Sequence, residues 1–176
     1  MLGQGPVDDL RLHRRIGSDG VSLTLAPLPR EDLSRLAGFS LPPGQAGFAD
    51  LPAVTLSTGA ARDGHVIISE GQPVGFFAID RDYADHHDFA PKGALGLRQF
   101  MIDHAAQGQG HASAACRALK SYLQAQYPGA DTCYLTVNCR NPNAHRAYLK
   151  GGFIDTGALY LDGGFGPQHI MCLPLT

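Results

Sequence analysis

Residues 97–127, LRQFMIDHAAQGQGHASAACRALKSYLQAQY, combine three elements in a fixed order. The first residues complete an apolar strand over 94–103, residues 107–112 form a glycine-containing loop, and an apolar stripe at helical spacing then continues to about residue 126. A glycine loop that leads into a helix leaves backbone N–H groups without intrahelical partners, at the positive end of the helix dipole. The stretch therefore predicts a strand–loop–helix unit that binds a phosphate or pyrophosphate group.

Three kinds of phosphate-binding loop have patterns that this segment could match. A Walker A loop ends in Gly-Lys-Ser/Thr, and no glycine of this chain is followed by such a pair. A dinucleotide loop, G-x-G-x-x-G/A, requires glycine or alanine where Ser113 stands, and only a short chain follows for the second half of a doubly wound sheet. The third pattern, Q/R-x-x-G-x-G/A, is matched at Gln107, Gly110 and Ala112.

A second motif lies downstream in residues 135–153, LTVNCRNPNAHRAYLKGGF. It matches V-N and then N-x-x-A-x-x-x-Y-x-x-x-G-F at Asn141, Ala144, Tyr148, Gly152 and Phe153. Through these two motifs, which lie in the right order within residues 97–153, the sequence resembles the GNAT N-acetyltransferases. The segment LRQFMID followed by QGQG is similar to their bacterial diamine and polyamine acetyltransferase branch.

The resemblance implies acetyl-CoA as co-substrate and a role for each motif residue. Backbone N–H groups of the loop would hold the coenzyme A pyrophosphate, at Gln107, Gly108, Gln109, Gly110, His111 and Ala112. Backbone groups of Phe100, Met101 and Ile102 would bind pantetheine and the acetyl carbonyl. Asn141, Ala144 and Tyr148 would also contact the cofactor, and Tyr148 would be the catalytic general acid, unless it only packs a helix on the sheet. Asn141 would bind pantetheine, cap its helix, or do both.

The general base stays open among Glu70, Asp80, Asp103 and His104, which all flank expected strands. The pair His86-His87 has carboxylates nearby, but adjacent residues point apart, so a solvated loop is expected there. The four cysteines have no C-x-x-C spacing, which indicates buried reduced thiols. No metal site is expected.

Composition and length bound the remaining interpretation. The 176 residues, 44% hydrophobic and 17% charged, fit a single domain over 19–176, with 1–18 as an irregular N-terminal arm. A net charge of −2 gives no general attraction to nucleic acid or an anionic membrane. No signal-peptide-like apolar run and no membrane-span-length apolar stretch occurs, so a cytoplasmic location is expected.

Alternation, turn residues and the resemblance predict a mixed α/β fold. The sheet is expected to be central, twisted and mostly antiparallel, with helices on both faces and a parallel crossover from strand 94–103 through the central helix to strand 132–137. Further strands are expected at 21–28, 65–69, 74–79, 153–161 and 168–173, and helices at 30–38, near 51–59 and from Pro142. The apolar phase changes between Leu97 and Phe100, which predicts a β-bulge near 98–99 unless the strand is buried on both faces.

The predicted function is acetyl transfer from acetyl-CoA to a primary amine of a small molecule, by direct attack in a ternary complex. A polyamine is the first acceptor, because the acidic loop 80–88 would suit a polycation. Amino acids, aminoglycosides and protein N-termini stay open as acceptors. The alternatives are a non-catalytic acyl-CoA-binding or regulatory module and a protein that binds ATP or NAD at the loop. A homodimer is compatible with the fold, although no stretch specifies an interface.

Overall fold

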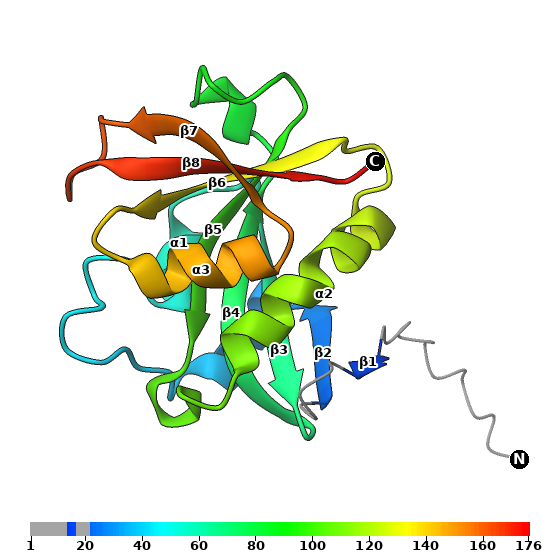
Figure 1. The fold of residues 1–176 in the computed structure, drawn as a ribbon. Helices are drawn as coiled ribbons and strands as arrows, with labels where there is room; N and C mark the ends of the chain where they lie inside the picture. Colours follow the sequence, from blue (N-terminus) through cyan, green and yellow to red (C-terminus); the bar gives the residue numbers. More distant parts are fainter. Residues whose placement is uncertain (1–13, 17–21) are drawn as a thin grey trace, which may run out of the picture.

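The computed structural model describes residues 14–16 and 22–176 and places their strands in one sheet of order β1-β2-β3-β4-β5-β6-β8-β7 (Figure 1). The strands are β1 (Arg14–Ile16), β2 (Ser22–Pro27), β3 (Arg62–Ser69), β4 (Gln72–Asp80), β5 (Leu95–Ile102), β6 (Thr132–Asn138), β7 (Ile154–Tyr160) and β8 (Gln168–Pro174). The helices are α1 (Pro52–Ser57), α2 (His111–Gln126) and α3 (Pro142–Lys150), with 3₁₀ turns η1 (Arg30–Leu36), η2 (Tyr83–Asp85) and η3 (His104–Ala106).

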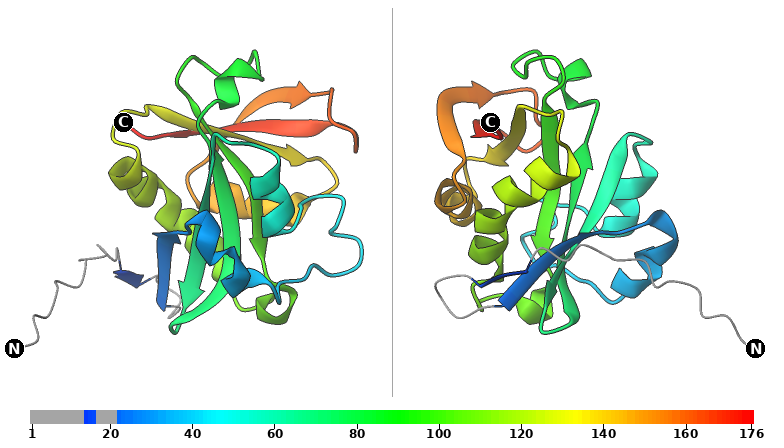
Figure 2. Two further views of the ribbon diagram at one scale, coloured as in Figure 1. Left: turned by 180° about the vertical axis from the view of Figure 1, so that it is seen from behind. Right: turned by 90° about the vertical axis from the view of Figure 1, so that its right-hand side faces the viewer.

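All neighbouring strands pair antiparallel except β5 and β6, which are parallel and joined through α2. Helices cover both faces of the sheet: α2 and α3 lie on one face, and α1 with η1 on the other (Figures 1 and 2). The predicted mixed α/β fold, with its mostly antiparallel sheet and one parallel crossover, is confirmed.

The helices pack on the two faces of the sheet through two apolar cores. The larger core packs α2 and α3 on the sheet and contains the whole predicted α2 stripe, Ala112, Ala115, Cys116, Leu119, Tyr122 and Leu123. The smaller core lies on the opposite face, where Leu36 of η1 and Leu56 of α1 pack on Phe76 of β4. The α2 stripe forms as its i, i+3, i+4 spacing predicts, because that spacing places every apolar residue on one side of the helix.

The bulge predicted in β5 is present. Phe76 pairs with Met101 and Ala78 with Arg98, so that two residues of β5 oppose one residue of β4. Gln99 at this point has a φ of +54°. The extra residue reverses the strand's parity: Leu97 before it and Ile102 after it both belong to the α2 core.

Several boundaries differ from the sequence predictions. Arg14–Ile16 forms β1, paired with β2, inside the expected irregular arm, while residues 1–13 and 17–21 lie outside the described chain. The helix expected over 30–38 is the 3₁₀ segment η1, with its last buried contact at Leu36. Within the described residues, no helix has the length and apolar character needed to cross a membrane.

Candidate functional site

The loop before α2 presents a row of unpaired backbone donors. The helix's first backbone hydrogen bond runs from the Ala114 N–H to the Gly110 carbonyl (3.1 Å). Within the described chain, the N–H groups of residues 108–113 have no hydrogen-bond partner. Gly108 (φ +77°) and Gly110 (φ +81°) provide the left-handed turns that aim these groups outward. A Cβ at either glycine would meet nothing within 4 Å, so the space in front of the loop is open.

The beginning of this loop, at Gln107, differs from the sequence prediction. The Gln107 N–H is already bonded to the His104 carbonyl (3.3 Å), and the Gln107 amide donates to the Ile102 carbonyl (3.1 Å). Gln107 therefore fixes the loop on β5 and does not add a free donor. His111 begins α2 and is only 7% exposed; its Nδ1 is buried and has no partner among the described residues. Gln109 projects into solvent.

Beside the loop, β5 and β6 diverge. They pair only at Leu95 with Cys133 and Gly96 with Tyr134, so Phe100, Met101 and Ile102 have no pairing partner on β6 (Figure 1). The opening begins where the bulge turns β5 away. The unpaired edge of β5 therefore leads, through η3, into the loop that carries the free donors.

Tyr148 of α3 lies against this open edge. Its ring makes an edge-on contact with Phe100 (centroids 5.9 Å apart) and a second with Phe153 (5.5 Å). The ring is buried, and the hydroxyl has no hydrogen-bond partner within the described residues. Burial raises the pKa of Tyr148 above its ordinary value, so the phenol stays protonated and can donate. Tyr148 therefore packs α3 on the sheet and also has a free hydroxyl that can donate a proton.

Asn141 caps α3. Its side-chain oxygen accepts a hydrogen bond from the Ala144 N–H (3.2 Å). The amide nitrogen of Asn141 has no partner within the described chain, so it is free to donate to a ligand. Both readings of Asn141 therefore remain compatible with one side chain.

The irregular segment 40–50 is attached to β5 and the loop by three sets of hydrogen bonds. The Ser40 N–H donates to Asp103 Oδ1 (2.8 Å), and the side chains of Gln45 and Gln107 exchange hydrogen bonds (3.1 and 3.4 Å). At the bulge, the Asp50 N–H donates to Gln99 Oε1 (2.7 Å), while Gln99 Nε2 donates back to the Asp50 carboxylate (3.3 Å). This segment forms a wall beside the bulge, and sequence reasoning identified none of its contacts.

The four candidates for a general base have different surroundings. Asp80 is buried, and its carboxylate lies 2.7 Å from Arg98 Nε and 3.9 Å from Arg62 Nε. Asp103 accepts from the wall segment, as described above. Glu70 and His104 are exposed. Both engaged carboxylates act as structural acceptors, and the structure singles out none of the four.

Asp50 is a carboxylate that the sequence analysis did not consider. It lies at the bulge itself, is exposed, and is held there by Gln99. Only its hydrogen bond with Gln99 marks Asp50 as part of the site, and no local sequence pattern indicates a contact between residues that are 49 positions apart.

The expected solvated pair His86-His87 is only half solvated. His86 is exposed, whereas His87 stacks on Tyr83 (centroids 4.0 Å apart) and its Nδ1 lies 3.0 Å from the Tyr83 carbonyl oxygen. The two rings do not converge on one metal position.

Comparison with known proteins agrees with this arrangement. The sequence model of the acetyltransferase (GNAT) family matches residues 37–153, which include both motifs. An uncharacterised N-acetyltransferase of Bacillus subtilis (strain 168), YbbJ, is 30% identical over 145 residues, covering 80% of this chain and 90% of its own length.

Solved structures share the fold. The aminoglycoside acetyltransferase AAC(6')-Ib with bound coenzyme A superposes with a TM-score of 0.68 at 20% identity, over 87% of this chain and 95% of its own. Spermidine N-acetyltransferase from Vibrio cholerae, with CoA and spermine, gives 0.62 at 18% identity, over 87% and 95%. With a family match over well more than half of its length, this chain belongs to the acetyltransferase (GNAT) family of enzymes, as its two motifs predicted.

Proposed function

We propose that the protein transfers an acetyl group from acetyl-CoA to a primary amine of a small molecule, by direct attack in a ternary complex. The single observation that carries the proposal is the alignment of three features: the free N–H groups of residues 108–113, the unpaired edge of β5, and Tyr148 against Phe100. A pyrophosphate, a pantetheine arm and a thioester sulfur occur in that order along acetyl-CoA.

The chain's own groups fit each part of that molecule. The loop donors and the positive end of α2 favour the pyrophosphate anion, and the buried Nδ1 of His111 offers one further polar atom at the same helix end. The free edge of β5 offers backbone groups to the amides of pantetheine, in the way that a strand edge binds an extended peptide. Acetyl-CoA here is a substrate that the protein positions.

The transfer itself is an aminolysis. The amine nitrogen attacks the thioester carbonyl carbon, the oxygen of that carbonyl becomes an oxyanion, and the C–S bond then breaks. A backbone N–H at the bulge would stabilise the oxyanion, and the Tyr148 O–H would give its proton to the leaving thiolate. Alkylammonium groups have a pKa of about 10, so the amine must give one proton to solvent or to a base before it attacks, and a second proton leaves the nitrogen as the amide forms.

A linear polyamine is the first acceptor that we propose. Asp50 lies beside the bulge, and Asp82, Asp85 and Asp88 are exposed on the neighbouring loop. These carboxylates would attract a cation, although Asp80 of the same loop is already neutralised by Arg98. Because a spermidine acetyltransferase and an aminoglycoside acetyltransferase share the fold, spermidine and an aminoglycoside are two polycationic acceptors to test. A homodimer stays a prediction.

The test is a calorimetric titration of the full chain with acetyl-CoA, with NAD and ATP as controls. It is followed by an assay of free thiol release with spermidine, kanamycin and a panel of simple amines. We expect acetyl-CoA to bind while NAD and ATP do not, and thiol release with spermidine. Acetyl-CoA binding without turnover of any amine would instead favour a non-catalytic acyl-CoA-binding module, and absence of acetyl-CoA binding would refute the proposal.

A further inference from the structure

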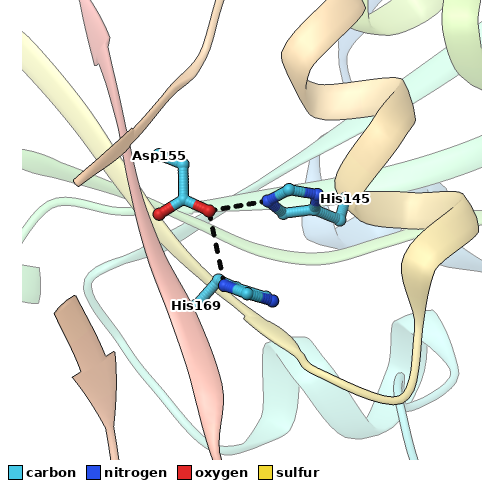
Figure 3. A group of neighbouring side chains, drawn as sticks. All are labelled: His145, Asp155 and His169. Carbon is cyan, nitrogen blue, oxygen red and sulfur yellow. Dashed lines mark hydrogen bonds and ion pairs between the residues drawn. The ribbon is translucent and has the colours of Figure 1, made fainter. Parts of the chain in front are cut away.

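Two histidines and one carboxylate converge between α3 and the β7–β8 hairpin (Figure 3). They are His145 of α3, Asp155 of β7 and His169 of β8, and their donor atoms all lie within 4.8 Å of one another (Figure 3). Asp155 Oδ2 is 2.8 Å from His145 Nε2 and 3.3 Å from His169 Nδ1. All three side chains are partly exposed, so solvent and ions can reach them.

The fold explains this meeting of residues. His169 shares a face of β8 with Met171 and Leu173, which pack in the core beneath the helices, so it lies on the α3 side of the sheet. The β7–β8 register is interrupted between Asp155 and Leu159, where β7 has three residues opposite the single residue Ile170. Asp155 itself pairs with Met171, two residues from His169 on the same face of β8, so it lies beside that imidazole.

The backbone of β7 also orients the Asp155 carboxylate. Asp155 Oδ1 accepts a hydrogen bond from the Gly157 N–H (2.8 Å), and Gly157 has a φ of +79°. One oxygen is therefore held by the backbone, while Oδ2 faces both histidines. Metal-ligating carboxylates are commonly oriented in this way by a second hydrogen bond.

We propose that His145, Asp155 and His169 bind a divalent transition-metal ion of the zinc type. Imidazole nitrogens with one carboxylate suit such borderline ions, whereas Mg²⁺ and Ca²⁺ prefer oxygen ligands. Tetrahedral zinc with ligands at about 2.0–2.1 Å requires ligand atoms about 3.3 Å apart. The distance from Asp155 Oδ2 to His169 Nδ1 already has this value, and the one to His145 Nε2 must open by about half an ångström.

The ion would join α3 to the paired strands β7 and β8. Its ligands come from α3, β7 and β8, and water would complete the fourth position. Because α3 also carries Tyr148, the ion would fasten the helix of the proposed acid to the closing hairpin. The site takes no part in the transfer chemistry proposed above, so each proposal can fail without the other.

The test uses the full chain without a histidine tag, titrated with ZnCl₂ at about pH 7.5, where imidazole is mostly neutral. We expect one ion to bind per chain and the melting temperature to rise with Zn²⁺. Asp155→Asn, which keeps an oxygen for the Gly157 N–H, and His169→Ala should each weaken binding by about tenfold or more. Co²⁺ should give the visible absorption of a tetrahedral site in the wild type and lose it in His169→Ala.

Two matched variants serve as controls. His104→Ala removes an exposed histidine outside the cluster, and Cys139→Ser removes the exposed thiol that could bind zinc by itself. Both should bind Zn²⁺ as the wild type does. The proposal is overturned if no stoichiometric binding occurs, if binding survives in both Asp155→Asn and His169→Ala, or if Cys139→Ser abolishes it. Circular dichroism without metal shows that each variant is folded, and if His169→Ala is not, Asp155→Asn decides.

Discussion

Acidification is expected to destabilise the protein through one buried histidine, His65 of β3. His65 Nδ1 lies 2.7 Å from the Tyr122 hydroxyl, and Nε2 lies 2.9 Å from the Tyr127 hydroxyl. Tyr127 donates its own proton to Asp63 Oδ2 (2.9 Å), so its oxygen must accept from His65 Nε2–H. Nδ1 is then the acceptor for Tyr122. A second ring proton would break this chain, because Nδ1 could no longer accept.

The magnitude follows from the pKa of His65. Burial lowers this pKa from 6.5 to about 4. Between these values the unfolded chain takes up a proton that the folded chain does not, so stability is intact above about pH 6.5 and falls as the pH drops toward 4. The complete loss is about 3 kcal/mol, of which about 2 kcal/mol has occurred at pH 5, at 1.36 kcal/mol per pKa unit.

Urea unfolding of the wild type and of His65→Gln at pH 7 and pH 5 measures how much His65 contributes to the pH dependence of the unfolding free energy. At pH 7 the variant should be less stable by about 1–3 kcal/mol, because tyrosine hydroxyls lose their partner. Between pH 7 and 5 the wild type should lose about 2 kcal/mol more than the variant, so that the two stabilities converge. His86→Gln, which replaces an exposed histidine, should follow the wild type. If His65→Gln keeps the wild-type pH dependence, His65 is not the group that titrates.

Three further substitutions test the site and its support. Tyr148→Phe keeps the ring and should lower kcat by about a hundredfold with little change in KM for acetyl-CoA; an unchanged kcat would remove Tyr148 from the acid role. Gly110→Asp introduces charge and strain at a φ of +81° and should abolish acetyl-CoA binding in calorimetry, whereas Gly129→Asp, in the turn after α2, should not. Gly151→Ala would place a Cβ 2.7 Å from the Cys116 carbonyl oxygen and should cost about 1–3 kcal/mol in urea unfolding; Gly129→Ala, which meets nothing within 4 Å, should be near neutral.

The loop turns, the α3 cap and the β5 bulge could be predicted because their determinants are local. Gly108 and Gly110 set the loop's turns, Asn141 caps the helix that follows, and the phase change around Gln99 marks the bulge. Each of these signals is contained within a few neighbouring residues. Gln107 differs from the prediction of a free backbone donor, because its N–H is bonded to the His104 carbonyl of η3 and its side chain fixes the loop on β5.

Other features could not be predicted because they depend on pairing register. Whether Asp155 meets His169 depends on the register that pairs Asp155 with Met171, and no pattern in the hairpin sequence gives that register. The expectation of no metal rested on cysteine spacing and on the pair His86-His87. It did not consider histidines that are 24 residues apart and brought together by a helix and a strand.

The loop before α2 depends on local residues, whereas the wall segment beside it depends on contacts that are distant in the sequence. The wall segment 40–50 is attached to β5 and its loop by hydrogen bonds that span 63, 62 and 49 residues, at Ser40, Gln45 and Asp50. These side chains could change with little effect on the N–H groups before α2, because those groups need only glycine turns. A chain can therefore keep these glycine turns while the wall segment varies. For this reason the motifs identify the family, whereas we expect the contacts of Gln99 with Asp50 to influence the choice of acceptor, which an amine panel tests.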